Sequence, residues 1–327
     1  MPVPAAVAIE PAGAAGLVRS PLNYTGGKFR LLPQILPLLP AGIRTFHDLF
    51  AGGGTVAANV PADRVVARDV IPDLVALLDW LARTPAPAVE AAVDALVTRH
   101  GLTDSRRHGY ARYGCESSAG LAPANRAAYA RLVAAHRRAR ADEDTDQRAA
   151  RFFALVIHGF NHQIRFNARG EWNIAVGKRD FNARIRANLA AFCDALQARP
   201  VRFLLASYDR LDLRRVRPED YLYADPPYLL TTAAYNERGG WTEAHERRLL
   251  AFLDRAHARG LRFGLSNALV HKGRRHALLE DWARTRGHRI HRLKVSYANA
   301  SYRRQGRDLE DREVLICNHP PGGQPSS

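Results

Sequence analysis

A β-loop-α-β-α order over residues 44–82 constrains the fold of this 327-residue chain more than any other feature. Arg44–Leu49 is predicted to be a strand that runs into Ala51 and the three glycines at 52–54, after which Thr55–Val60 begins a helix. Arg64–Arg68 predicts a second strand, and Pro72–Ala82 carries leucines on one helical face. This order predicts the opening of a doubly wound α/β domain with a Rossmann-like sheet.

The α/β pattern stops after residue 85 and resumes at residue 185. Between them, residues 86–184 are polar, rich in arginine and predicted to be mainly helical. The resumed part predicts helices at 185–196 and 242–259 and strands at 201–205, 221–224, 262–265, 291–295 and 313–317. We therefore expect one α/β domain formed by residues 19–85 and 185–318, an inserted helical domain at 86–184, and disordered tails at 1–18 and 319–327.

The sequence Asp225-Pro226-Pro227-Tyr228 follows the predicted strand at 221–224. Each proline fixes its own φ and holds the residue before it extended, so the loop is stiff. A stiff loop of this composition can direct a carboxylate, the Pro226 carbonyl and an aromatic ring at one point. The two oxygens can accept the hydrogens of an exocyclic amino group on a flat base, and Tyr228 can stack on the ring. The alternative is an ordinary proline-rich turn with a surface aspartate.

The glycines at 52–54 lie between a predicted strand and a helix, and Asp69 ends the next strand. Glycines allow a ligand to approach the backbone closely, and an acid at this place commonly binds ribose hydroxyls. Together they indicate a cofactor that contains adenosine. The G-x-G-x-x-G spacing of dinucleotide enzymes fails after Gly54, and Gly26-Gly27-Lys28-Phe29 is not a P-loop, because Ser or Thr should follow the lysine.

A formal net charge of +16 favours a polyanionic partner such as nucleic acid. Only four of the 48 basic residues are lysine, which indicates a compositional bias toward arginine. The net charge therefore supports a nucleic-acid partner but is not sufficient evidence for one. The three cysteines are too far apart in sequence for a metal or disulfide framework, and we expect a cytoplasmic protein. No apolar run approaches the ~20 residues of a membrane span.

The motifs stand in the order of a known family. Tyr24-Thr25-Gly26-Gly27-Lys28, Asp48-Leu49-Phe50-Ala51-Gly52-Gly53-Gly54, Asp69 and Asp225-Pro226-Pro227-Tyr228 resemble the Dam-like DNA adenine N6-methyltransferases with a DPPY motif in the α order. Shorter matches occur at 165–167, 170–173, 207–208, 265–267 and 313–316, so the resemblance spans about residues 21–318.

This resemblance implies an enzyme that depends on S-adenosylmethionine and methylates a flipped-out adenine in duplex DNA. The catalytic loop would be Asp225, Pro226, Pro227 and Tyr228. The implied cofactor-binding residues are Tyr24, Lys28, Asp48, Phe50, Gly52, Gly54, Asp69, Val70, Ser207, Tyr208 and Asp225. Residues 86–184 resemble the target recognition domain, with a hairpin at Asn161–Gly177 in which the DNA-binding candidates are Asn161, Arg165, Asn167 and Arg169.

The family further implies a monomer, GATC as a possible recognised sequence, and a possible cognate restriction endonuclease as partner.

Other readings of the sequence remain open. Arg165 and Arg169 could be solvated surface charges, and His288 and His291, three residues apart, lack the further ligands of a metal site. The whole chain could be a methyltransferase of RNA adenine or of cytosine N4, or a basic DNA-binding protein without catalysis. Asp at position 225 favours adenine over cytosine.

Overall fold

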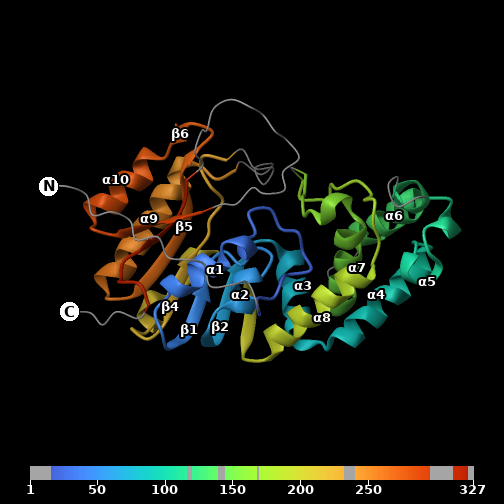
Figure 1. The fold of residues 1–327 in the computed structure, drawn as a ribbon, viewed down its shortest axis with the longest axis horizontal. Coiled ribbons are helices and arrows are strands. Elements are labelled where there is room, and N and C mark those ends of the chain that lie inside the picture. The colour runs from blue at the N-terminus through green and yellow to red at the C-terminus, as the bar shows by residue number, and fades with distance from the viewer. Residues whose placement is uncertain are drawn as a thin grey trace.

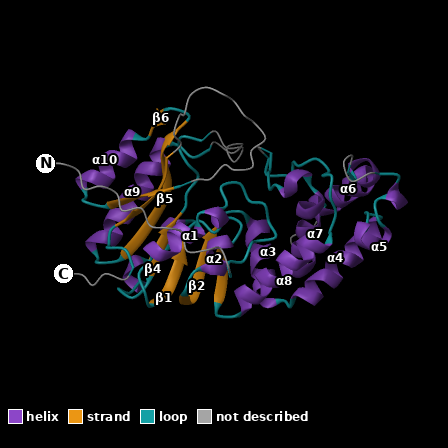
Figure 2. Cartoon of the chain, in the orientation of Figure 1, coloured by secondary structure: helices purple, strands orange, loops and turns teal. Residues whose placement is uncertain are grey.

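The structure is a computed structural model that describes residues 16–115, 120–138, 144–167, 169–231, 240–294 and 312–322. The chain forms a sheet with helices packed against it, and a group of helices that extends to one side (Figure 1). Strands occupy the centre of the first part, and the second part is almost entirely helical (Figure 2). The predicted α/β class, with a mainly parallel sheet, is therefore confirmed.

The sheet has eight strands, with β6 paired only to β5 and the others in the order β3-β2-β1-β4-β5-β8-β7. β1 to β5 run parallel, and β8 is antiparallel to both of its neighbours. The strands are β1 (Ile43–Asp48), β2 (Ala62–Asp69), β3 (Val201–Leu205), β4 (Tyr221–Ala224), β5 (Arg262–His271), β6 (Arg274–Arg275), β7 (Arg289–Leu293) and β8 (Arg312–Cys317).

Two hydrophobic clusters cover the sheet. In β4, Tyr221 and Tyr223 belong to one cluster and Leu222 and Ala224 to the other, because successive side chains of a strand face opposite sides. The four residues are fully buried. The first cluster contains α1 (Leu32–Ile35), α2 (Thr55–Asn59), α3 (Pro72–Arg83) and α8 (Ala183–Gln197), and the second contains α9 (Glu243–Ala258) and α10 (Ala277–Thr285).

The chain order places a crevice between β1 and β4. After β1 the chain adds β2 and β3 on one side, and β4 then pairs with the other side of β1, with Asp48 opposite Tyr223. The connections leave the carboxyl ends of these two strands in opposite directions. In open α/β sheets, ligands bind at such a switch point.

Residues 86–182 form a helical part attached to α3. Its helices are α4 (Ala86–His100), α5 (Ser105–His108), α6 (Ala122–Arg137) and α7 (Thr145–His158). Their apolar residues belong to the same cluster as the first face of the sheet, so the two parts share one core. The division into a catalytic domain and an inserted recognition domain stays a prediction, and its expected boundary at residue 185 falls inside α8.

The remaining short helices are 3-10 turns: η1 (Lys28–Arg30), η2 (Leu36–Leu38), η3 (Ala111–Tyr113), η4 (Phe160–His162), η5 (Tyr208–Arg210) and η6 (Leu213–Arg215). Thr242 caps α9 through a capping box with His245, and Gly260 follows the helix with a positive φ. The sequence reasoning missed α10 and β6 and ended β5 six residues early.

The inner ends of the expected tails are packed, which corrects the tail boundaries. Val18 exchanges two hydrogen bonds with the side chain of Asn59, at 2.7 and 2.8 Å. His319 is buried, and its Nε2 lies 2.9 Å from the hydroxyl of Tyr221. Residues 1–15 and 323–327, which complete the expected tails, lie outside the described residues. Within the described ranges, no helix is long and apolar enough to cross a membrane.

Gly54 offers a test of the packing between the first βα turn and the core. Its φ is +71°, and an added Cβ would lie 3.0 Å from Leu78 Cδ2 and 3.1 Å from Phe192 Cζ. Gly260 has a φ of +73° but open space around it, so it is the matched control. Gly260→Ala should destabilise by about 1 kcal/mol through its φ alone. Gly54→Ala should cost roughly 2–4 kcal/mol because overpacking is added. If urea unfolding shows equal losses in the free energy of unfolding for the two variants, the packing of Gly54 against Leu78 and Phe192 is contradicted.

Candidate active site

A cavity of about 1020 Å³ opens at the carboxyl ends of the central strands. Its wall is formed by the segment before η1, the loops that follow β1 to β4, the hairpin after α7, and residues of β5 and β8. Most of the expected cofactor and catalytic residues meet there: Tyr24, Lys28, Phe50, Gly52, Asp69, Val70, Ser207, Tyr208, Asp225, Pro226, Pro227 and Tyr228.

The backbone of the glycine loop is hydrogen-bonded to the side chain of Asp69, the acid that ends β2. Gly52 has a φ of +48° and donates its N–H to Asp69 Oδ2 at 3.0 Å. Asp69 Oδ1 accepts from the N–H groups of Val70 at 2.7 Å and Ile71 at 3.1 Å. Burial raises the pKa of Asp69, and these three donors oppose the shift. The carboxylate thus fixes both loops at the wall of the cavity.

Tyr24 lies directly on the glycine loop. A Cβ added to Gly53 would lie 2.9 Å from Tyr24 Cβ, and one added to Gly52 would lie 3.1 Å from its ring. Glycine is therefore needed at both positions, because a side chain would displace Tyr24. The contact brings the N-terminal segment over the loop, on the cavity wall.

Asp225 and Lys28 form an ion pair inside the cavity. Lys28 Nζ lies 2.9 Å from Asp225 Oδ1, donates to the Gly26 carbonyl at 2.7 Å, and stands 4.9 Å from the centroid of the Tyr228 ring. The lysine side chain is only 4% exposed. Burial raises the pKa of Asp225 to about 6, and Lys28 limits the rise. Lysine therefore keeps the carboxylate ionised at neutral pH in a site that disfavours charge.

Glu313 on β8 was missed as a site residue. Its Oε2 accepts a hydrogen bond of 3.4 Å from the Tyr228 hydroxyl, and it also lines the cavity. Burial, with the charges of Asp225 and Glu313, raises the pKa of Tyr228 well above its ordinary value. The tyrosine is therefore held neutral, with its ring fixed between Lys28 and Glu313. The sequence does contain a match to the family at residues 313–316, but that match assigns no role to Glu313.

Aromatic rings lie on another part of the wall. The Phe50 ring centroid lies 5.3 Å from that of Tyr208 and 5.7 Å from that of Trp241. Val70 is 64% exposed, which is unusual for a valine, and it too faces the cavity. Exposed apolar and aromatic surfaces of this kind suit a flat ring. Trp241 was not predicted, because nothing close to it in sequence indicates a site.

Two expected cofactor residues lie behind the wall rather than on it. Asp48 is 1% exposed, and burial raises its pKa to about 8 although Phe50 donates an N–H to it at 3.3 Å. Gly54 faces Leu78 and Phe192 in the core. Both residues shape the glycine loop from inside the protein.

The hairpin after α7 uses its predicted DNA-binding residues largely for its own structure. Asn167 Oδ1 accepts the N–H groups of Arg169 and Glu171, both at 3.0 Å, which closes the turn. Arg165 donates twice to the Asn173 carbonyl, at 3.0 and 3.1 Å, and also lines the cavity. Asn161 accepts a hydrogen bond at its carbonyl from Asn23. The guanidinium of Arg169 is mostly exposed beside Glu171.

Further cavity residues were not predicted, among them Arg148, His245, Arg248 and His271. They come from helices and strands that are far from the motifs in sequence, so only the fold brings them in. Within the ranges that the structure describes, no group of three or more His, Cys, Asp or Glu residues is arranged to hold a metal ion.

Comparison with known proteins decides the family. The profile described as D12 class N6 adenine-specific DNA methyltransferase matches residues 24–299. The chain belongs to this family. The resemblance inferred from the motifs is therefore confirmed, and the family as a whole implies S-adenosylmethionine as the methyl donor.

Individual relatives support this membership. The chain is 33% identical to the type II methyltransferase M.FokI of Planomicrobium okeanokoites and 30% identical to the modification methylase StsI of Streptococcus sanguinis. Both alignments cover 92% of this chain but 43% of the relative, so the chain spans less than half the length of either. It is also 26% identical to the DNA adenine methylase of Escherichia coli (strain K12), over 67% of this chain and 68% of that protein.

Removing the Lys28 charge should change the titration of Asp225. Lys28→Met should raise the pKa of Asp225 above about 6, because burial is then unopposed. Lys28→Arg keeps the charge and is the control. Because the pKa of Asp225 is higher in the folded than in the unfolded protein, the free energy of unfolding falls as pH rises from the ordinary carboxyl pKa to the pKa in the folded state. Lys28→Met should extend this fall to higher pH. Carboxyl-carbon NMR titration measures the shift, and an unchanged titration in Lys28→Met would contradict the pairing.

Proposed function

We propose that this chain transfers a methyl group from S-adenosylmethionine to the N6 amino group of adenine in duplex DNA. The observation that carries the proposal is the arrangement at the switch point. The Asp225 carboxylate, ion-paired with Lys28, shares one cavity with the glycine loop and Asp69. A group that accepts amino hydrogens therefore lies beside a site suited to an adenosine cofactor. Membership of the D12 class supports the same reaction.

The residues present fit the methyl donor. The cavity of about 1020 Å³ is at the upper end of the roughly 300–1,000 Å³ of small-molecule sites, so it has room for a cofactor together with a base. Asp69 would bind the ribose, and Val70 with Tyr208 would contact the adenine of the cofactor. The backbone of Gly52 and Gly53, which line the same cavity, would contact the methionine part. Bound S-adenosylmethionine supplies a methyl group already activated by its sulfonium.

The chain's own residues must then make N6 a nucleophile, because its lone pair is delocalised into the purine ring. The Asp225 carboxylate and the Pro226 carbonyl would accept the two amino hydrogens and draw the nitrogen toward tetrahedral geometry. As positive charge develops on nitrogen, the ionised carboxylate stabilises it. The stiffness of the two prolines fixes these acceptors before the base arrives, so less conformational entropy is lost when the base is positioned for reaction.

The target adenine cannot reach this cavity while it is stacked in a duplex. Flipping it out costs a few kcal/mol. The Tyr228 ring, fixed between Lys28 and Glu313, would return part of this cost by stacking on the base. The hairpin after α7 contributes Ile164, Arg165, Phe166 and Gly170 to the same wall, which supports a role in guiding the duplex to the loop.

The proposal extends to the biological setting. Two of the relatives are named as a type II methyltransferase and a modification methylase, which favours a partner endonuclease that cuts the same unmodified sequence. The recognised sequence would be GATC only if the hairpin reads bases as in Dam-like enzymes. We take the active form to be a monomer, which sedimentation of the purified chain tests.

Asp225→Ala should reduce kcat by at least roughly 10²–10³-fold, the effect of removing one preorganised group from a transition state. Binding of S-adenosylmethionine should persist, because the glycine loop and Asp69 are unchanged. The measurement is incubation with methyl-labelled cofactor and unmethylated duplex DNA, followed by digestion to nucleosides. Label in N6-methyldeoxyadenosine supports the proposal, and mapping it gives the site.

Label in N4-methylcytosine in this assay would overturn the base assignment. No label on DNA, with measurable cofactor and duplex binding, would favour a binding protein without catalysis. Near-normal turnover by Asp225→Ala would refute the role of the carboxylate.

Replacing Tyr228 separates stacking from hydrogen bonding. Tyr228→Phe keeps the ring and loses the hydroxyl with its contacts to Glu313 and Asp225, so we expect kcat within roughly tenfold of the parent. Tyr228→Ala removes the stacking surface, worth about 1–3 kcal/mol per base, and should lose about 10–10²-fold in kcat/KM. Steady-state kinetics on one duplex compares the variants. Equal losses in both would assign the role to the hydroxyl instead.

A further inference from the structure

A second basic surface lies outside the cavity, on the helical part. Arg106, Arg107 and Arg112 on or beside α5 and η3, with Lys178 and Arg179 after the hairpin, are all exposed. We call these five residues the α5 surface. In Figure 1, α5 lies at the end of the helical part that is farthest from the sheet. No role in the cavity is available to these residues, since none of them lines it.

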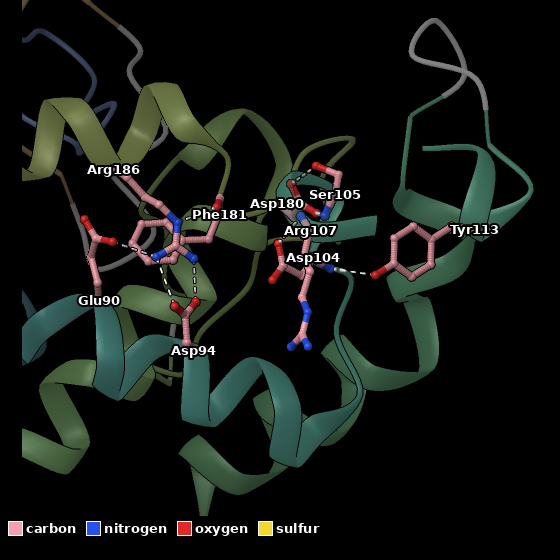
Figure 3. Close-up of polar contacts among 9 residues, drawn as sticks. All are labelled: Glu90, Asp94, Asp104, Ser105, Arg107, Tyr113, Asp180, Phe181 and Arg186. Atoms are coloured by element: carbon pink, nitrogen blue, oxygen red, sulfur yellow. Dashed lines mark hydrogen bonds and ion pairs between the residues drawn. The ribbon is translucent and has the colours of Figure 1, made fainter. Parts of the chain in front are cut away.

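The segment that presents the arginines is rigidly anchored. Asp180, which is 1% exposed, accepts three hydrogen bonds: from the Ser105 N–H at 2.7 Å, the Ser105 hydroxyl at 2.7 Å and the Thr103 hydroxyl at 3.0 Å. The Tyr113 hydroxyl accepts the Asp104 N–H at 2.8 Å. Figure 3 shows the contacts of Ser105 with Asp180 and of Asp104 with Tyr113, with the Arg107 guanidinium directed away from them. The same bonds bring residues 103–113 beside residues 178–180.

The acids of these two segments do not neutralise the basic side chains. Asp180 is occupied by the donors above, and Asp104 caps α5 by accepting the Arg107 N–H at 3.1 Å. Among the described residues, the five members of the α5 surface form no ion pair. Arg186 in the same part is the contrast, since it is buried between Glu90 at 2.8 Å and Asp94 at 2.5 Å (Figure 3).

The α5 surface is continuous with the hairpin. Lys178 and Arg179 directly follow Gly177, whose N–H donates to the His158 carbonyl at the base of the hairpin. Burial lowers the pKa of the hairpin residue His162 to about 4. The positive charge of Arg179 lowers this pKa further, which means that Arg179 lies near His162. A basic path therefore runs from the hairpin to α5.

We propose that the α5 surface binds the phosphate backbone of duplex DNA on the flank of the target site, beyond the bases that the hairpin reaches. Arginine guanidinium groups match phosphate oxygens, and contacts to phosphates position a protein without reading sequence. The hydrogen bonds to Asp180 already order the segment that carries the arginines, so little conformational entropy is lost when DNA binds. This inference rests on the proposed action on duplex DNA and adds a second, sequence-independent contact to it.

The test compares two duplexes with the same centre, one of about 12 base pairs and one of about 30, and measures affinity by fluorescence anisotropy over a range of salt. Each lost phosphate contact lowers the slope of log K against log salt by about 0.9. Arg106→Ala/Arg107→Ala/Arg112→Ala should therefore lower the slope by about 2–3 on the long duplex and weaken binding roughly 10–10²-fold near 0.1 M salt. Binding to the short duplex and kcat at saturating DNA should be unchanged.

The matched control is Arg214→Ala/Arg215→Ala/Arg217→Ala. It removes the same charge from exposed positions before β4, at the edge of the sheet opposite the cavity, and should keep the parent slope. An equal slope change in both variants would overturn the proposal in favour of general charge. An unchanged slope in the α5 variant would also overturn it, even if the parent methylates DNA. If the α5 variant no longer binds the long duplex more tightly than the short one, the role of the α5 surface is upheld, even if the parent methylates no DNA. If the parent protein binds no duplex at all, the proposed role of the α5 surface is overturned.

Discussion

The ion pair between Lys28 and Asp225 is the interaction on which the rest of the site depends. Both groups are largely buried, and the desolvation of a buried pair can offset its attraction, so the pair is a poor source of stability. Its consequence is electrostatic. A carboxylate whose pKa burial raises to about 6 stays charged at neutral pH because an ammonium group lies 2.9 Å away. The reaction that we propose needs that charge at the moment when nitrogen becomes positive.

The sheet explains why this pair forms between residues almost 200 positions apart. The β4 loop carries Asp225, and the glycine loop after β1 supports Tyr24 and thereby the segment that carries Lys28. Because β1 and β4 are paired in parallel at the switch point, their following loops meet at one edge. The bond from Gly52 to Asp69 attaches the loop after β2 to the same edge. Strand order thus places the Asp225 carboxylate beside the sites that we propose for the cofactor and the base.

Sequence reasoning found those elements whose signal is local. β3 and β4 were predicted to the residue, because apolar runs between polar turns mark buried strands. β5 was ended too early because Ser266 and Asn267 look like a turn. Both are fully buried, and each has a partner that only the fold supplies: the Tyr223 hydroxyl at 2.8 Å and Glu246 at 3.0 Å. Glu313 and Trp241 were missed for the same reason, since their roles depend on distant neighbours.

A polar cluster fixes the helical part to the loop that would hold the cofactor. Asp73, just after Val70 and Ile71, accepts a hydrogen bond of 2.6 Å from Arg148 on α7 and lies 3.3 Å from His136 on α6. Burial opposes the charge of Asp73, yet these two partners lower its pKa. Removing one partner would leave the buried charge of Asp73 only partly compensated, which is destabilising. The hairpin that follows α7 is therefore held in a defined position against the adenosine side of the cavity. The same contact would couple the hairpin that we propose to guide the duplex to the loop that would hold the cofactor.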